Sequence, residues 1–341
     1  MDITRLNNEL SRTGEKIRYL QMLDRAMRSW DPPRQKTKLP GPLILQIQTS
    51  DLCNGSCDMC PYSCKEKSDR ANLMDRELYL KILEELKTAG IVCNVIAMLQ
   101  NEPLTDSNVH SLISDSKNIL GSHVHTNVVT NGTLLSPSRA DELIKAGLDT
   151  FTISIDAFRE QTYRNIRKGH DFNKMMFNLK SLLNRRRRPA VVVKFMKLAE
   201  NQGEEKPFLH YWKKQGASVW IHEPCSRAGT LPEYEKFRRN KHGFTPPSIN
   251  RMITNVIHKK FSFCLRPFFM LEVLQDGRVI LCNNDWDHEA VAGDLSRQSL
   301  DEVWNGDLMN RHRHMLYTGD VDDGGICSRC SYSRGHFRNR D

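Results

Sequence analysis

Eight of the ten cysteines in this chain of 341 residues fall into three groups, and two stand alone. The groups are Cys53, Cys57, Cys60 and Cys64; Cys264 and Cys282; and Cys327 and Cys330. So many cysteines in a chain of this size indicate metal or redox chemistry in a reducing compartment, rather than a disulfide framework. Of the two single cysteines, Cys93 is expected in the core, and Cys225 ends a strand-like run.

The first group has the spacing Cys53-x₃-Cys57-x₂-Cys60 and directly follows a strand-like run. Three thiolates in one short loop can bind one metal site. Zinc is the alternative, but zinc sites are usually built from two separated cysteine pairs. With no histidine nearby, three cysteines leave one coordination position open, and in an iron–sulfur cube that open iron can bind a small molecule. Cys64 stays the alternative fourth ligand, although it lies beyond the tight loop.

This CxxxCxxC sequence resembles the signature of the radical S-adenosylmethionine (SAM) superfamily, and the resemblance extends over residues 43–225. It implies a [4Fe–4S] cluster held by Cys53, Cys57 and Cys60, with S-adenosyl-L-methionine bound at the open iron. An electron passed into SAM would release methionine and a 5′-deoxyadenosyl radical, which abstracts a hydrogen atom from the substrate. The resemblance also implies an electron donor of the flavodoxin or ferredoxin type.

Four side chains near the first two strands match positions at which this family binds SAM. Met59 stands just before the last cysteine, where the family places a residue that contacts adenine. Gln100-Asn101-Glu102-Pro103 follows the second strand, in the place of a GGEP-type motif that binds the methionine amino group. It keeps Glu-Pro and replaces both glycines, and its backbone and Glu102 carboxylate can still accept hydrogen bonds from an ammonium.

Four more matching positions follow later in the chain. Thr130 and Asn131 end the third strand, where the family often contacts the ribose of SAM. Ser154 ends the fourth strand and Arg167 lies in the helix after it, and the resemblance implies ribose or carboxylate contacts for both. A strand-end cap and a surface ion pair are the alternatives for these two residues.

The remaining paired cysteines have the spacing Cys264-x₁₂-Gly277-x₄-Cys282, followed by Cys327-x₂-Cys330. This pattern resembles the SPASM/twitch extension of radical SAM enzymes and implies an auxiliary [4Fe–4S] cluster. The full SPASM pattern has seven cysteines and two clusters, so four cysteines indicate the shorter twitch form with one fully ligated cluster. Full ligation favours electron transfer over substrate binding. A structural zinc site is the alternative.

The elements that must position these residues alternate between strand-like and helical patterns. Strand-like runs cover residues 43–47, 93–99, 123–129, 150–155, 191–196 and 218–222, and helical stretches include 78–87, 138–146 and 172–184. Such alternation predicts an α/β fold with right-handed crossovers and a parallel sheet. With the resemblance it indicates a partial (β/α)₆ TIM-like barrel, whose active site lies at the carboxyl ends of the strands.

The regular alternation stops near residue 225, and a small C-terminal α+β extension is expected. Apolar runs at 268–274 and 279–281 flank Asp276-Gly277, which predicts a β-hairpin, and a short helix is expected over 300–304. We therefore expect three parts: an N-terminal helical extension over 1–40, a radical SAM core over 41–228, and a linker with the twitch/SPASM domain over 229–341.

Composition limits the partners. The formal net charge is +9, and hydrophobic residues make up 39% of the chain. The densest basic run, at 185–188, is expected to be a solvated helix end, and it lacks the interleaved aromatic residues that nucleic-acid binding favours. No apolar run is long enough to span a membrane, and no secretory signal is visible, so a cytoplasmic location is expected.

The outcome of hydrogen abstraction remains open at this stage. An auxiliary cluster favours a two-electron oxidation, as in a dehydrogenase, whereas a thiol at Cys225 could return a hydrogen atom and give an epimer. A leader-binding domain is not expected, because residues 1–40 are too short for one. We therefore expect a small polar substrate from antibiotic or other natural-product biosynthesis, such as a sugar, aminocyclitol or nucleoside. A peptide- or protein-modifying maturase and a zinc-binding nucleic-acid protein are the alternatives.

Overall fold

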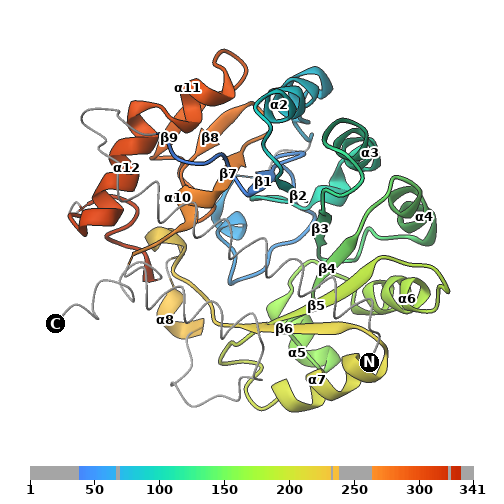
Figure 1. Ribbon diagram of the computed structural model, residues 1–341. Coiled ribbons are helices and arrows are strands. Elements are labelled where there is room, and N and C mark those ends of the chain that lie inside the picture. The colour runs from blue at the N-terminus through green and yellow to red at the C-terminus, as the bar shows by residue number, and fades with distance from the viewer. Residues whose placement is uncertain (1–37, 67–69, 232, 238–262, 322–323, 332–341) are drawn as a thin grey trace.

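The computed structural model describes residues 38–66, 70–231, 233–237, 263–321 and 324–331 (Figure 1). The predicted helical extension at 1–40 lies almost entirely outside these residues. Most of the polar segment before the predicted hairpin also lies outside them. The division into three parts therefore stays a prediction.

Six parallel strands form the barrel-like part of the sheet. They are β1 (Ile44–Ile47), β2 (Asn94–Ala97), β3 (Thr126–Thr130), β4 (Thr150–Ser154), β5 (Ala190–Met196) and β6 (Ser218–His222). Each strand pairs in parallel with the next one along the chain. Figure 1 shows these strands curving around a centre, with helices on the outer side. The predicted α/β fold with a partial (β/α)₆ barrel is confirmed.

Six helices cover the outer side of the sheet, and short polar side chains cap three of them. The six helices are α2 (Arg76–Thr88), α3 (Val109–Leu120), α4 (Pro137–Lys145), α5 (Glu160–Ile166), α6 (Phe172–Leu183) and α7 (Glu205–Lys214). Asp75 accepts hydrogen bonds from the first backbone N–H groups of α2, and Ser136 and Asp171 do the same for α4 and α6. Such caps satisfy donors that have no partner inside the helix.

Apolar side chains fill the space between the sheet and these helices. One core cluster includes Phe151, Val193 and Phe208, and a second includes Leu45 and Tyr79; all five are fully buried. Because successive side chains of a strand point to opposite faces, the residues between these apolar ones point to the concave side. The polar residues of the six strands are therefore left to line the inside of the barrel.

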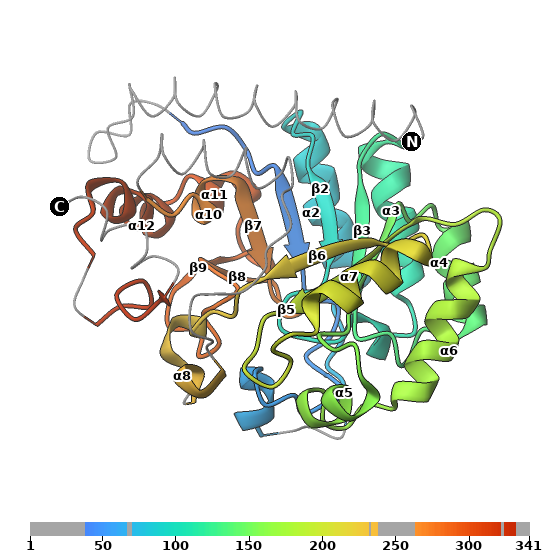
Figure 2. The ribbon, with the colours of Figure 1, turned by 90° about the horizontal axis from the view of Figure 1, so that it is seen from below.

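The C-terminal extension continues the same sheet. Strand β7 (Met270–Val273) pairs in parallel with β1, and β8 (Arg278–Ile280) and β9 (Val291–Asp294) follow in antiparallel order. The result is one sheet of nine strands, in the order β6-β5-β4-β3-β2-β1-β7-β8-β9. Helices α10 (Arg266–Phe269), α11 (Leu300–Trp304) and α12 (Asp307–Thr318) lie beside it (Figure 2). The extension is α+β, as predicted.

The hairpin of this extension differs in one detail from its prediction. Gly277 forms the turn with φ of 93°, a conformation that favours glycine, so the expected Asp-Gly turn is confirmed. The expected strand over 268–274 is wrong at its start, because Pro267 lies at the beginning of a short helix, α10, which ends at Phe269. Proline favours the first positions of a helix.

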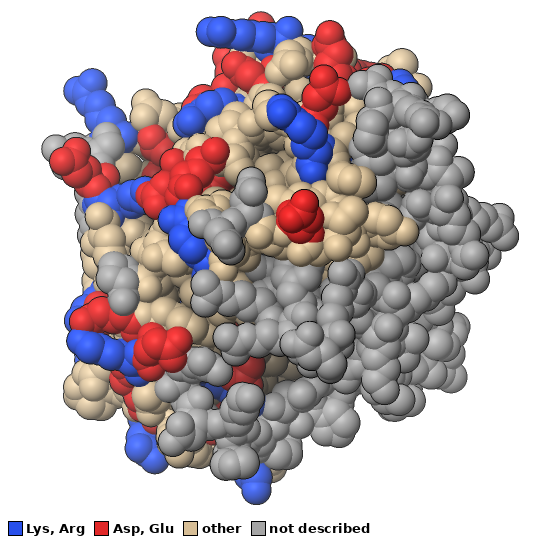
Figure 3. All heavy atoms as spheres, turned by 90° about the vertical axis from the view of Figure 1, so that its left-hand side faces the viewer, with Lys and Arg blue, Asp and Glu red and all other residues tan. Residues whose placement is uncertain are grey.

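Charge is spread over the described surface. Arg186 and Arg187 follow α6 and are exposed, as expected for a solvated helix end, whereas Arg185 pairs with Asp141 at 2.9 Å. In Figure 3, basic and acidic side chains alternate over the described part of one face. No helix among the described residues is long and apolar enough to span a membrane.

Candidate active site

A cavity of about 510 Å³ opens inside the barrel and reaches the C-terminal extension. Every side chain that the sequence indicated as a site residue lines it. These residues are Cys53, Cys57, Met59, Cys60, Gln100, Asn101, Glu102, Thr130, Asn131, Ser154, Arg167, Cys225, Cys264, Cys282, Cys327 and Cys330. Segments separated by more than two hundred residues in the chain therefore meet at one site.

The loop with the first cysteine group lies at the end of the sheet to which β1 and β2 point (Figure 2). The backbone N–H of Ser56 donates to Lys168 at 2.9 Å, and that of Cys60 donates to Cys57 at 3.0 Å. A Cβ atom on Gly55 would lie 2.1 Å from Nε2 of His170, so a larger residue would displace that ring. The glycine thus allows the cysteine loop to pack against the chain after α5.

The thiols of this loop are shielded from solvent. Burial raises the pKa of Cys53 to about 12, and it also raises the pKa values of Cys57 and Cys60. Metal binding requires their deprotonated form, and nearby cations favour that form: Arg167 Nη1 lies 3.8 Å from Cys57 Sγ, and the charge of Arg227 lowers the pKa of Cys60. The loop fits an anionic cluster bound by three thiolates.

Cys64 lies outside this arrangement. It is exposed at the end of a short helix, η2 (Pro61–Cys64), and does not line the cavity. Its part as a fourth ligand is therefore not supported by its position. Cys93 is buried in the core under β2, as expected.

Arg167 forms a buried ion pair. Its guanidinium contacts the carboxylate of Asp156, and the two side chains are 13% and 1% exposed. Asp156 Oδ1 also accepts a hydrogen bond of 2.6 Å from the backbone of Met196. Burial alone would lower the pKa of Arg167, but the charges of Asp156 and Cys57 outweigh it and raise that pKa. The alternative of a surface ion pair is thus wrong, and the SAM contact of Arg167 stays a prediction.

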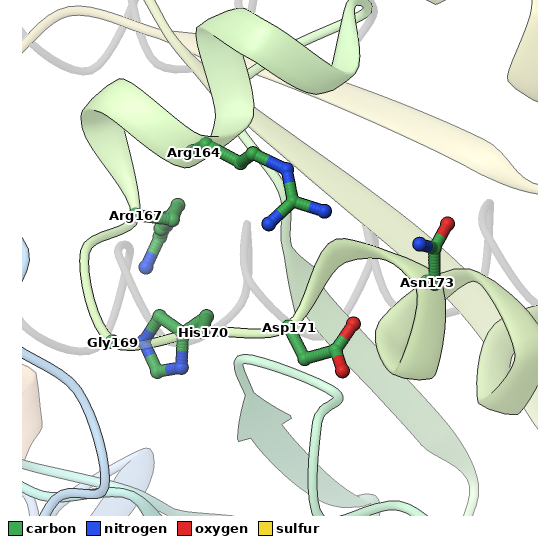
Figure 4. A pocket seen from close by; sticks show the side chains of 6 residues that line it. All are labelled: Arg164, Arg167, Gly169, His170, Asp171 and Asn173. Carbon is green, nitrogen blue, oxygen red and sulfur yellow. The ribbon is translucent and has the colours of Figure 1, made fainter.

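A second, more open pocket lies on the outer side of Arg167. Its volume is about 440 Å³, and Arg164, His170 and Asp171 also line it (Figure 4). Arg167 and His170 line both this pocket and the central cavity. These two side chains therefore lie between the two cavities.

Glu102 joins the ends of β2 and β3. Its carboxylate accepts hydrogen bonds from the hydroxyl of Thr130, from the backbone of Asn131 at 2.7 Å and from the backbone of Leu104 at 3.2 Å. Burial raises its pKa to about 7, although these hydrogen bonds act in the opposite direction. A carboxylate has about four acceptor positions, so one is left for an ammonium group. The predicted contact with SAM is compatible with this geometry.

The side chains that replace the two motif glycines are held by the protein. Gln100 donates to the carbonyl of Asp285 at 2.8 Å and pairs with Nε2 of His288 at 2.9 Å. Asn101 accepts from the backbone of Leu99 at 3.1 Å. Gln100 thus connects the end of β2 to the loop after β8. Its predicted contact with SAM would involve the backbone.

The other predicted contacts differ in how their side chains are held. Asn131 donates to Asn54 at 2.8 Å and accepts two hydrogen bonds from Thr133, so it orders the turn after β3. Met59 is buried against a small apolar cluster. Ser154 has no side-chain hydrogen bond among the described residues, so its hydroxyl is available to a ligand.

The four C-terminal cysteines, which form the second cysteine group, line the cavity together, and the guanidinium of Arg266 at the start of α10 acts on Cys264 and Cys282. This guanidinium pairs with the fully buried Glu272 at 2.8 Å. Burial raises the pKa values of Cys264, Cys282 and Cys327, whereas the charge of Arg266 lowers those of Cys264 and Cys282. Two thiols near this cation, with two more lining the same cavity, fit an anionic cluster.

Cys225 lines the same cavity as the two cysteine groups. Its Sγ is 3.4 Å from Oδ1 of Asn284, which belongs to the loop after Cys282. Other residues that were not predicted also line this cavity, among them Lys194, Trp220 and His222. The signal was present, because alternate residues of a strand share one face, and β5 and β6 place these three side chains toward the inside.

Residues 47–206 match the family model described as the radical SAM superfamily, and residues 264–331 match the SPASM model, described as an iron-sulfur cluster-binding domain. The chain belongs to the radical SAM superfamily. It is a radical SAM enzyme with a C-terminal SPASM domain. The predicted cofactors are confirmed as SAM, a SAM-binding [4Fe–4S] cluster and an auxiliary [4Fe–4S] cluster.

Curated relatives of this radical SAM enzyme differ in how much of the chain they match. A GTP 3′,8-cyclase of Clostridium botulinum is 27% identical over 51% of the chain and 54% of the cyclase, so the chain spans about half the length of that relative. A SAM-dependent 2-deoxy-scyllo-inosamine dehydrogenase of Niallia circulans is 18% identical over 84% of the chain and 92% of the dehydrogenase.

Solved structures confirm the fold. The structure of BtrN in complex with AdoMet and 2-DOIA is 18% identical to this chain, with a TM-score of 0.58. The match covers 86% of this chain and 94% of the BtrN chain. The structure of Streptococcus suis SuiB bound to precursor peptide SuiA is 15% identical to this chain, with a TM-score of 0.62. The match covers 86% of this chain and 70% of the SuiB chain.

Proposed function

We propose that this enzyme oxidises a small polar molecule by two electrons, with the auxiliary cluster as electron acceptor. The observation that carries this proposal is that both cysteine groups line one cavity. When bound, SAM and its cluster supply a radical that takes a hydrogen atom. A substrate in the cavity would then lose an electron and a proton, which completes a dehydrogenation. The proposed ligands are Cys53, Cys57 and Cys60 for one cluster, and the four C-terminal cysteines for the other.

The residues around the cavity would position the cofactors and exclude water. Glu102 would accept from the ammonium group of SAM, and Met59 would pack against its adenine. Arg167 would compensate the charge of the thiolate at Cys57. Buried cations beside thiolates favour an anionic cluster in a medium of low dielectric constant. An electron donor of the flavodoxin or ferredoxin type belongs to the same proposal.

The extent of the similarity supports a small substrate. The chain matches 92% of a relative named as a dehydrogenase of 2-deoxy-scyllo-inosamine. The structure of SuiB with a precursor peptide matches over only 70% of its own length. A peptide substrate, for which SuiB is the precedent, is therefore the second choice.

Epimerisation is the second candidate reaction, because Cys225 lines the same cavity. A thiol there would return a hydrogen atom to the substrate radical, so its removal should stop turnover without loss of either cluster. In an oxidation, by contrast, the Cys225→Ala variant should remain active.

The reaction is tested with anaerobically reconstituted enzyme, SAM and reductant in deuterated water. A panel of sugars, aminocyclitols and nucleosides is screened for 5′-deoxyadenosine formation above the level without substrate. Oxidation predicts a product lighter than the substrate by two hydrogen atoms, from both the wild type and Cys225→Ala. A product of unchanged composition that carries a solvent deuteron, formed only by the wild type, would contradict the proposal.

A further inference from the structure

One side of the cavity carries positive charge. We define the basic wall as Lys194 on β5, His222 on β6 and Arg227 in η4 (Arg227–Gly229). In the sheet, Lys194 lies opposite Trp220, and Met196 lies opposite His222. All three members line the cavity, and each lies within electrostatic range of the others, since the charges of Lys194 and Arg227 both lower the pKa of His222.

No carboxylate among the described residues pairs directly with the two cations of the basic wall, although the charge of Asp156 also acts on Lys194. Among the described residues, Arg167 pairs with Asp156 and Arg266 pairs with Glu272. Within the same part of the chain, Lys194 has no ion pair, and its ammonium lies 4.9 Å from the centroid of the Trp220 ring. Arg227 donates to Asn284 at 3.1 Å, with no carboxylate among its described partners.

Two buried polar atoms, one in the basic wall and one elsewhere in the lining of the cavity, have no hydrogen-bond partner among the described residues. They are Nε2 of His222 and Nε1 of Trp286, and both residues line the cavity. A buried polar group without a partner costs about 1–3 kcal/mol, so such groups in a cavity indicate a ligand that satisfies them.

The chemistry of these two atoms specifies what the ligand must offer. Nδ1 of His222 lies 3.2 Å from the carbonyl oxygen of Glu223. Because a carbonyl only accepts, Nδ1 carries the proton and Nε2 of the neutral ring is an acceptor. Trp286 Nε1 is a donor only. The ligand thus needs acceptor oxygens for Lys194 and Trp286, and a hydroxyl that donates to His222.

We infer that the substrate of this enzyme is a small hydroxylated anion, whose carboxylate or phosphate group binds at the basic wall with its ring beside Trp220. This inference rests on the proposed function, since it assigns the substrate of the same cavity. The inferred substrate differs in charge from a substrate that bears an amine. An amine would add a third cation next to Lys194 and Arg227, where like charges repel.

The test measures binding, so that it does not depend on turnover. Four sugars of similar size are titrated into reconstituted enzyme with SAM bound: D-glucuronate, D-glucose 6-phosphate, neutral D-glucose and cationic D-glucosamine. We expect at least one anion to bind about tenfold more tightly than glucose and glucosamine, which corresponds to about 1.4 kcal/mol. The stronger of the two anions identifies a carboxylate or a phosphate.

Three variants test whether Lys194 causes the preference for anions. Lys194→Met should abolish the preference for anions, whereas Lys194→Arg should retain most of it. Lys214→Met removes the same charge from the exposed end of α7 and should change nothing. SAM affinity should be the same in all three variants.

Three results would overturn the inference. They are equal affinities for all four sugars, no saturable anion binding up to about 10 mM, or a Lys194→Met variant that loses SAM affinity instead of the preference for anions. Failure of the proposed function would appear separately, as wild-type enzyme that binds anions but forms no 5′-deoxyadenosine.

Discussion

Replacing Arg167 by Gln should destabilise the protein far more than an ordinary surface substitution. The change leaves the carboxylate of Asp156, which is only 1% exposed, without its cationic partner. Removing one member of a buried ion pair typically costs about 3–5 kcal/mol, because the remaining charge stays buried. The matched control is Arg164→Gln in the last turn of α5, just before Arg167, which is the residue after this helix. Arg164 pairs with Glu160 at 2.6 Å, but these side chains are 48% and 45% exposed, so we expect a loss of about 0.2–1 kcal/mol.

The assay is urea denaturation of the cluster-free protein, followed by circular dichroism under anaerobic conditions. The free energies of unfolding of both variants are compared with that of the wild type. Because Arg167 also contacts Cys57 Sγ at 3.8 Å, the Gln variant should in addition reconstitute less of the SAM-binding cluster. An Arg167→Gln variant no less stable than Arg164→Gln would refute the argument from the buried ion pair.

Two further predictions concern the cofactors. SAM affinity should fall by about tenfold per pH unit below the Glu102 pKa of about 7, because protonation removes the negative charge that attracts the ammonium of SAM. Above that pH the affinity should level off. Glu102→Gln should bind SAM weakly at every pH, so a wild-type affinity that does not change between pH 6 and 8 would contradict this role. Replacing Cys282 and Cys330 by Ala should remove about four irons while SAM cleavage without product persists; zinc in place of iron in the reconstituted wild type would contradict the auxiliary-cluster assignment.

Local patterns in the sequence predicted most of the fold. Alternating strands and helices indicated the parallel barrel, and Asp276-Gly277 indicated the hairpin turn. The pairing of β7 with β1 could not be predicted this way, because periodicity does not specify which strand lies at which edge. The start of that strand was wrong because Pro267 favours a helical turn, which extends to Phe269.

In the site, too, sequence spacing predicted some features, whereas contacts between distant parts of the chain could not be predicted. Cysteine spacing identified both groups, since ligands of one cluster must converge. The contacts of Gln100 with the loop at His288 join parts of the chain far apart in sequence, and nothing local announces them. Lys194 and His222 could have been found by following the alternation along β5 and β6. Only the three-dimensional structure shows what these side chains lack. Among the described residues, the ammonium of Lys194 has no ion pair, and Nε2 of His222 has no hydrogen-bond partner.

The central claim is that Cys53, Cys57 and Cys60 hold the cluster that cleaves SAM. The most direct measurement is iron content together with 5′-deoxyadenosine formation, in anaerobically reconstituted wild type and in the variant with all three residues replaced by Ala. The account predicts about eight irons and SAM cleavage for the wild type, and about four irons and no cleavage for the variant. Cys64→Ala, as the control, should behave like the wild type. A triple variant that still forms 5′-deoxyadenosine would contradict the claim.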